Sequence, residues 1–158
     1  MATRAAASVK ERALRLLSFR SRSRAEMTRR LERAGFEPEE VEAAVQDLER
    51  VGLIDDERFA RELAEHHRRR GNGRRVGLAA LRMKGVDRGL AEQAVEETNP
   101  EDEAERAAEV AARRLPRLRN LEPELRQRRL FEFLLRRGYD PEVARGACFR
   151  AMAEEEVT

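Results

Sequence analysis

The sequence contains no tryptophan and only one cysteine. Its aromatic residues, phenylalanine and tyrosine, make up 4% of the chain. A single cysteine, Cys148, excludes an intramolecular disulfide and a cysteine-based metal cluster, and it fits a reducing cytoplasm. No hydrophobic run approaches the length of a membrane-spanning helix. The N-terminal segment carries charges where a secretory signal would be apolar. We therefore expect a cytoplasmic protein that does not enter a membrane.

Charged residues, by contrast, make up 41% of the chain, and their sign alternates over long segments. The basic segments are 4–33, 68–88 and 113–137, and the acidic segments are 37–57 and 92–109. Leucine, alanine and valine recur between these charges at helical spacing, and arginine and glutamate are themselves good helix formers. No segment alternates with period two, as a strand would. The pattern predicts an all-α protein with thin hydrophobic cores.

An internal repeat underlies the alternating charge. Three segments can be superimposed, namely 31–45, 81–95 and 134–148. In each, a leucine stands four residues before a glycine, and a hydrophobic residue and then an acid follow the glycine. The three glycines are Gly35, Gly85 and Gly138. A glycine in the left-handed conformation ends one helix and the acid caps the next, so each copy should contain a tight corner. The period of about fifty residues is typical of helical repeats.

A longer helix should precede each corner, over about residues 9–20, 56–70 and 101–115. Asp55 or Asp56 is expected to cap the second of these helices, and Asn99-Pro100 marks the start of the third. Ser23 to Glu26 form a capping-box pattern at the start of the first copy's middle helix. The sequence thus predicts nine helices in three tandem three-helix, helix-turn-helix-like repeats, covering 1–51, 52–98 and 99–158, in an elongated, curved array.

No residue constellation in the sequence indicates catalysis. The acidic pair Asp55-Asp56 suggests a metal or nuclease site, but its place at a helix start makes capping the better interpretation. His66 and His67 are adjacent and point about a hundred degrees apart on a helix, so they cannot share a metal ion. Cys148 falls at a buried position of the repeat. We expect no cofactor, no metal and no enzymatic activity.

Two arginine clusters are candidate contact sites. One comprises Arg20, Arg22 and Arg24, and the other comprises Arg68, Arg69, Arg70, Arg74 and Arg75. Arginines scattered among glutamates usually form a solvated helix face, but these clusters concentrate charge at helix ends. Arginine forms fork-like contacts with phosphate and carboxylate. A nucleic-acid backbone and an acidic protein groove would therefore suit them equally well.

The junction between the first two copies resembles the RecX family, the bacterial regulators of the RecA recombinase. The segment GLIDDERFAREL (52–63) is followed by RRRGNGRR and then by LRMKGV (81–86). The matching positions are Gly52, Leu53, Ile54, Asp55, Asp56, Phe59, Ala60, Leu81, Lys84, Gly85 and Val86. The upstream segment RSRSRAEM (20–27) is similar to the family as well. One departure follows Gly73, where the family's proline is absent and Arg74 and Arg75 stand near the position of its basic residue.

The resemblance implies a monomeric regulatory protein of DNA recombination, DNA repair and the SOS response. Such a protein would bind the RecA–DNA filament and inhibit its ATPase, strand exchange and growth, with the two arginine clusters and Lys84 as contacts and at most weak DNA binding. A stand-alone helix-turn-helix DNA-binding protein is the alternative, and it predicts tight, sequence-selective duplex binding that survives moderate salt. A generic helical adaptor would show neither behaviour.

Overall fold

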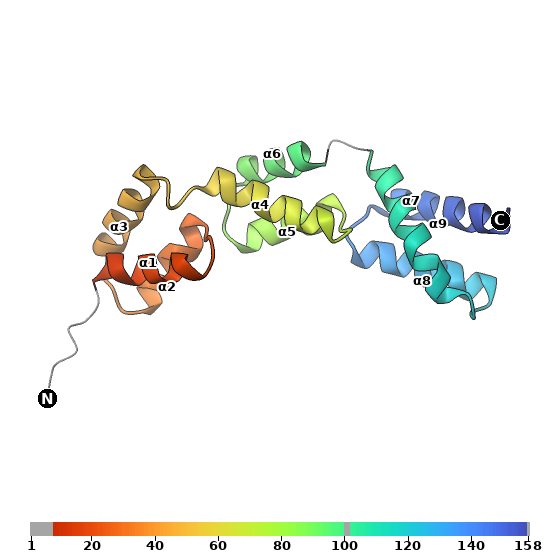
Figure 1. Cartoon of the computed structure of the whole chain (residues 1–158), viewed down its shortest axis with the longest axis horizontal. Coiled ribbons are helices and arrows are strands. Elements are labelled where there is room, and N and C mark those ends of the chain that lie inside the picture. Colours follow the sequence, from red (N-terminus) through yellow and green to blue (C-terminus); the bar gives the residue numbers. More distant parts are fainter. Residues whose placement is uncertain (1–7, 100–101, 158) are drawn as a thin grey trace, which may run out of the picture.

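The protein is an elongated, gently arched row of helices in the computed structural model, which describes residues 8–99 and 102–157 (Figure 1). Within these ranges it contains no strand. The helices are α1 (Val9–Phe19), α2 (Arg24–Arg33), α3 (Pro38–Arg50), α4 (Asp56–Arg69), α5 (Arg74–Met83), α6 (Arg88–Thr98), α7 (Glu103–Arg114), the short 3₁₀ helix η1 (Leu115–Leu118), α8 (Pro123–Arg136) and α9 (Pro141–Glu156). The predicted all-α repeat fold is confirmed. None of these helices is long and apolar enough to cross a bilayer.

Each group of three helices surrounds a hydrophobic core of its own. We call α1–α3 the first unit, α4–α6 the second and α7–α9, with η1, the third. The repeat leucines Leu31, Leu81 and Leu134 stand at the centre of the three cores, each with no exposed surface. Ile54, in the segment that links the first two units, packs into the first core. Because each core is small, a single large side chain contributes much of a unit's stability.

The corner predicted from the repeat is present in all three units. Gly35, Gly85 and Gly138 have φ angles of 96°, 71° and 89°, which is the left-handed region where a side chain is strained. Asp87 caps α6, and Asp140 caps α9. Glu37 occupies the N-cap of α3 but makes no side-chain capping bond, so that prediction was wrong. Glutamate is a poor capping residue because its extra methylene carries the carboxylate past the backbone amides.

Two other predicted helix starts need correction. The third unit begins with Asp102, whose carboxylate accepts a hydrogen bond from the Ala104 amide (3.0 Å), whereas Asn99 ends α6. Pro100 lies outside the described residues. At α2, Ser23 accepts from the Glu26 amide (3.1 Å), so half of the capping box is present. The Glu26 side chain instead contacts Arg20 and Lys84, because the second unit packs against this helix end.

Candidate functional site

The first joint connects the N-terminus of α2 with the second unit. The Ser23 hydroxyl donates a hydrogen bond to the carbonyl of Lys84, and the Arg24 amide donates to Asp56 (2.7 Å). A Cβ atom on Gly85 would lie 2.5 Å from the Cβ of Ala25, so the two helices touch where glycine leaves room. Asp55 caps α4 as predicted, through the Arg58 amide (3.1 Å). Asp56 therefore connects the two units, whereas Asp55 caps α4.

The second joint repeats the arrangement of the first. Gly73 holds the N-cap of α5, the position that Ser23 holds in α2, and its amide donates to the Arg137 carbonyl (2.7 Å). The Arg74 amide donates to Glu103 (2.8 Å), as Arg24 does to Asp56. A Cβ on Gly73 would lie 2.6 Å from the Gly138 carbonyl oxygen. The starts of α2 and α5 thus each dock on the corner of the following unit.

Tyr139 and Arg137 strengthen the second joint. Tyr139 is fully buried, and its hydroxyl donates to the Gly71 carbonyl (2.9 Å). Burial raises the pKa of Tyr139, so the hydroxyl remains a neutral donor. One guanidinium nitrogen of Arg137 donates to the Arg70 carbonyl (2.6 Å) and reaches Asn72 Oδ1 (3.4 Å). The third unit is therefore held by polar contacts from its corner as well as by close packing.

The first arginine cluster is engaged inside the molecule. Arg20 pairs with Glu26, and Arg22 is only 6% exposed and lies 3.8 Å from the same carboxylate. Arg24 pairs with Glu42 and Glu49 at 2.7 Å each. Lys84 reaches Glu26 across the first joint, at 3.7 Å. These cations stabilise the first unit and its joint, and their contact with a partner remains a prediction.

Glu26 lies at the centre of this charge network. Burial alone would raise the pKa of Glu26, but the hydrogen bond and charge of Arg20 and the charge of Lys84 outweigh burial and lower it. A carboxyl whose folded pKa is lowered stabilises the protein above its unfolded pKa, and this stability is lost as the pH falls through the folded value. The ion pairs of the first joint are therefore in place at neutral pH.

The second arginine cluster is divided by the structure. Arg74 contacts Glu96 (3.4 Å) and the Asn99 carbonyl (2.7 Å), and Arg68 is half-buried. Arg75 is exposed on α5. Arg69 and Arg70, also exposed, lie at the end of α4, where the second unit meets the third. Arg68 lines one cleft with Arg69, and Arg69 and Arg70 line a neighbouring cleft together with arginines of the third unit.

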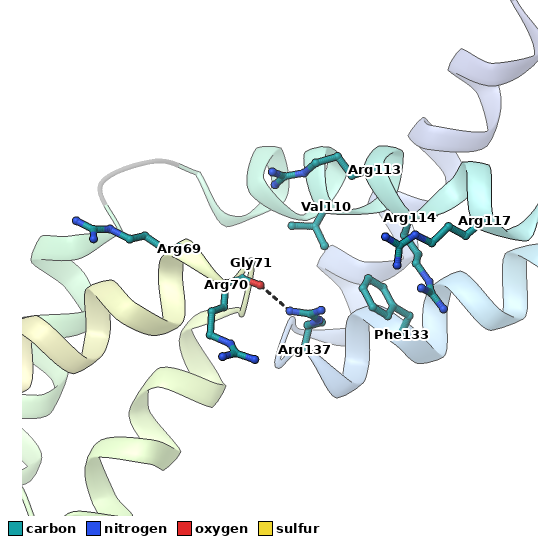
Figure 2. A pocket seen from close by; sticks show the side chains of 9 residues that line it. All are labelled: Arg69, Arg70, Gly71, Val110, Arg113, Arg114, Arg117, Phe133 and Arg137. Carbon is teal, nitrogen blue, oxygen red and sulfur yellow. Dashed lines mark hydrogen bonds between the residues drawn. The ribbon is translucent and has the colours of Figure 1, made fainter.

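We call this cleft the arginine cleft. Figure 2 shows it between the end of α4 on one side and α7 and α8 on the other. It has a volume of about 210 Å³ and contains Gly71, Val110 and Phe133 in its wall. Six arginines surround it, namely Arg69, Arg70, Arg113, Arg114, Arg117 and Arg137. The guanidinium groups of Arg114 and Arg137 each lie 5.0 Å from the centre of the Phe133 ring, at cation–π distance.

The positive charge of the arginine cleft is largely uncompensated. Arg69 pairs with Glu65 (3.0 Å), whereas the other five arginines form no ion pair within the ranges that the structure describes. Several like charges around one concavity raise the local concentration of anions. Sequence reasoning identified 113–137 as a basic segment but singled out no residue in it, because only the docking of the units brings these side chains to Arg69 and Arg70.

The described residues show little that suggests catalytic chemistry. Across residues 8–99 and 102–157, no group of three or more histidine, cysteine or acidic side chains could hold a metal ion. Cys148 is buried in the third core, and burial raises the pKa of its thiol to about 11. A thiol with such a pKa is a poor nucleophile at neutral pH.

Comparison with known proteins identifies the family. Three family profiles match in order along the chain: "RecX, first three-helix domain" over residues 10–48, the second domain over 55–95 and the third over 101–148. The chain belongs to the RecX family. It is 36% identical to "Regulatory protein RecX" of Amycolatopsis mediterranei (strain U-32), over 92% of this chain and 82% of that protein. The RecX protein of Thermobifida fusca (strain YX) is 37% identical, over 90% of this chain and 75% of its own length.

Solved structures share the fold of this RecX family member. The crystal structure of RecX from Lactobacillus salivarius superimposes with a TM-score of 0.78 over 92% of this chain and 95% of that one. The two sequences are 20% identical, so the similarity concerns the fold. It extends over all three units and includes their relative arrangement.

Proposed function

We propose that this protein regulates the RecA recombinase by binding the RecA–DNA filament. The observation that carries the proposal is the complete, ordered set of three RecX domains, together with relatives that are named regulatory proteins. Bound along the filament, the chain restrains ATP hydrolysis, strand exchange and filament growth. These effects follow if one elongated molecule contacts neighbouring RecA subunits and so opposes their movement.

The architecture suits a repeating partner. A filament presents the same surface at regular intervals, and a row of similar units can place a similar face against each of them. The joints fix the spacing of these faces, because α2 and α5 each dock on the following unit, where the Arg24 and Arg74 amides donate to Asp56 and Glu103. The exposed arginines Arg69, Arg70 and Arg75 are the members of the predicted clusters that are best placed to contact the filament.

The charge of the helices that follow the corners argues against the alternative of a stand-alone helix-turn-helix protein. In such proteins this helix enters the major groove of DNA. Here the solvent-facing residues of α3 include Glu39, Glu40 and Glu42, and those of α6 include Glu92 and Glu96. Carboxylates at these places would face the phosphate backbone and repel it. The surface therefore favours a protein partner for these two units.

The proposal predicts a direct effect on RecA. Adding the protein to RecA and ATP on single-stranded DNA should lower the rate of ATP hydrolysis, with most of the loss reached at or below one molecule per RecA subunit. The decrease is expected because a molecule that spans subunits acts on several active sites at once. An unchanged rate at stoichiometric and higher concentrations would refute the proposal.

A further inference from the structure

The arginine cleft differs from the other charged regions of the molecule. Several arginines elsewhere pair with nearby carboxylates, as Arg24 does with Glu42 and Glu49, and Arg126 with Glu155 at 2.7 Å, and others are spread singly over the surface. In the cleft, five guanidinium groups gather with no carboxylate partner among the described residues. Mutual repulsion makes such a cluster unfavourable unless an anion neutralises it. The cleft therefore calls for a ligand with several negative charges.

We propose that the arginine cleft binds a row of linked phosphate groups and that the bound ligand locks the third unit onto the second. The phosphates come either from a free oligophosphate, such as a nucleoside triphosphate, or from the backbone of a nucleic-acid strand. This inference goes beyond the proposed regulation of RecA and does not rest on the family assignment, and the site shares Arg69 and Arg70 with the expected filament contact.

The side chains of the cleft suit linked phosphate groups. Guanidinium groups present paired donors that match phosphate oxygens. In Figure 2 the side chains of Arg114, Arg117 and Arg137 lie around Phe133, whereas the Arg69 side chain extends away from it. The volume of about 210 Å³ corresponds to roughly seven water molecules, which is room for more than one phosphate group. Linked phosphates carry a charge on every repeating unit, whereas uncharged residues separate the carboxylates in most acidic peptides.

Phe133 positions guanidinium groups instead of stacking on a base. Arg114 and Arg137 both lie at cation–π distance from its ring. The Nε atom of Arg114 is buried and has no hydrogen-bond partner within the described ranges, so this guanidinium is already desolvated on one side. A desolvated cation gains more from an anion than a hydrated one. Recognition at this site should therefore depend on phosphate and be indifferent to the base.

The ligand would contact both sides of the second joint. Arg69 and Arg70 belong to the second unit, whereas Arg113, Arg117 and Arg137 belong to the third. Arg137 already crosses the joint through its bonds to Arg70 and Asn72. A ligand that contacts both units binds the docked arrangement more tightly than the undocked one, and it therefore shifts the equilibrium toward docking.

Binding to three probes tests the site. Titration calorimetry with tripolyphosphate and with ATP, and fluorescence anisotropy with a labelled oligo(dT), should detect binding to the wild-type protein. The double variant R113Q/R117Q should lose at least tenfold in affinity, because two exposed cleft cations are removed without disturbing the core. For oligo(dT), the slope of log K against log salt should become shallower by about 1.4, since each phosphate contact contributes roughly 0.7 for a single strand.

The matched control is R145Q/R150Q, which removes two exposed arginines of the same unit outside the cleft. It should change each affinity less than twofold. Tighter binding of tripolyphosphate and ATP than of oligo(dT) at equal phosphate concentration would identify free oligophosphates as the source, and tighter binding of oligo(dT) would identify a strand backbone. An equal loss in both double variants, no binding of any probe, or a preference for a glutamate-rich peptide of equal charge would overturn the proposal.

Amide hydrogen exchange tests the locking. The Gly73 amide donates to the Arg137 carbonyl across the joint, so its exchange rate reports undocking of the third unit. A saturating concentration of the probe that binds should slow this exchange at least fivefold in the wild-type protein and leave it unchanged in R113Q/R117Q. Unaltered exchange at Gly73 in the ligand-bound wild-type protein would refute the lock.

Discussion

Replacing Leu134 with alanine is expected to lower the free energy of unfolding of the third unit by about 2–5 kcal/mol, enough to unfold much of that unit. Leu134 has no exposed surface and contacts a core made mostly of small residues, such as Ala107 and Ala111. Small neighbours on helices cannot move in to fill the space, so the full cost of the cavity remains. The equivalent leucines, Leu31 and Leu81, should show similar costs in their own units.

The single cysteine of the chain provides the measurement. Cys148 is buried in the same core, so a thiol reagent reacts with it only when the third unit opens. Leu134→Ala should accelerate this reaction at least thirtyfold, whereas Leu135→Ala, at a neighbouring position that is 37% exposed, should change it only a few-fold. Equal reactivity of the two variants would show that the core is not organised around Leu134.

The second large effect is expected from Gly73→Ala, which should separate the third unit from the second. Gly73 has a φ of −75°, so alanine meets no backbone strain there. Its Cβ would, however, lie 2.6 Å from the Gly138 carbonyl oxygen and 2.9 Å from the Tyr139 nitrogen, which are backbone atoms that cannot rotate away. The overlap and the poorer N-cap together should destabilise the docked arrangement by about 2–4 kcal/mol.

Small-angle scattering and hydrogen exchange would detect the separation. Amide exchange at residue 73 and near Tyr139 should accelerate, while amides in the three cores should exchange as slowly as in the wild-type protein. Gly146→Ala is the control, because a Cβ at Gly146, on the exposed face of α9, meets nothing within 4 Å. It should stabilise the protein slightly, by about 0.5–1 kcal/mol. Unchanged dimensions and exchange in Gly73→Ala would mean that this close approach does not form in solution.

The sequence predicted the fold well because the information for each unit is local. A leucine, a glycine four residues later and an acid two residues after that are enough to specify a corner, and the structure has all three corners at Gly35, Gly85 and Gly138. Helical periodicity placed the intervening helices within a few residues. The errors concern single helix caps, such as Glu37, whose acidic side chain is too long to accept a hydrogen bond from the amides of its own helix start.

The joints and the arginine cleft could not be predicted in the same way. Asp56 and Glu103 accept bonds from amides of the preceding unit, and nothing in their immediate sequence distinguishes them from ordinary residues of a first helical turn. The cleft combines Arg69 with Arg117 and Arg137, residues that become neighbours only when two units dock. The basic segment 113–137 was a signal for the arginines that the third unit contributes to the cleft. The repeat indicates, in addition, that the corner at Gly138 faces the preceding unit, as the corner at Gly85 does.

We infer that the chain acts by lying along the RecA–DNA filament, and hydrogen exchange on the assembled complex tests this binding mode most directly. The protein would be measured alone and bound to preformed RecA filaments on single-stranded DNA. Lengthwise binding predicts slower exchange on exposed surfaces of at least two units, including the Arg69–Arg75 segment at the second joint. Exchange unchanged in the presence of filaments, or slowed in one unit alone, would contradict it.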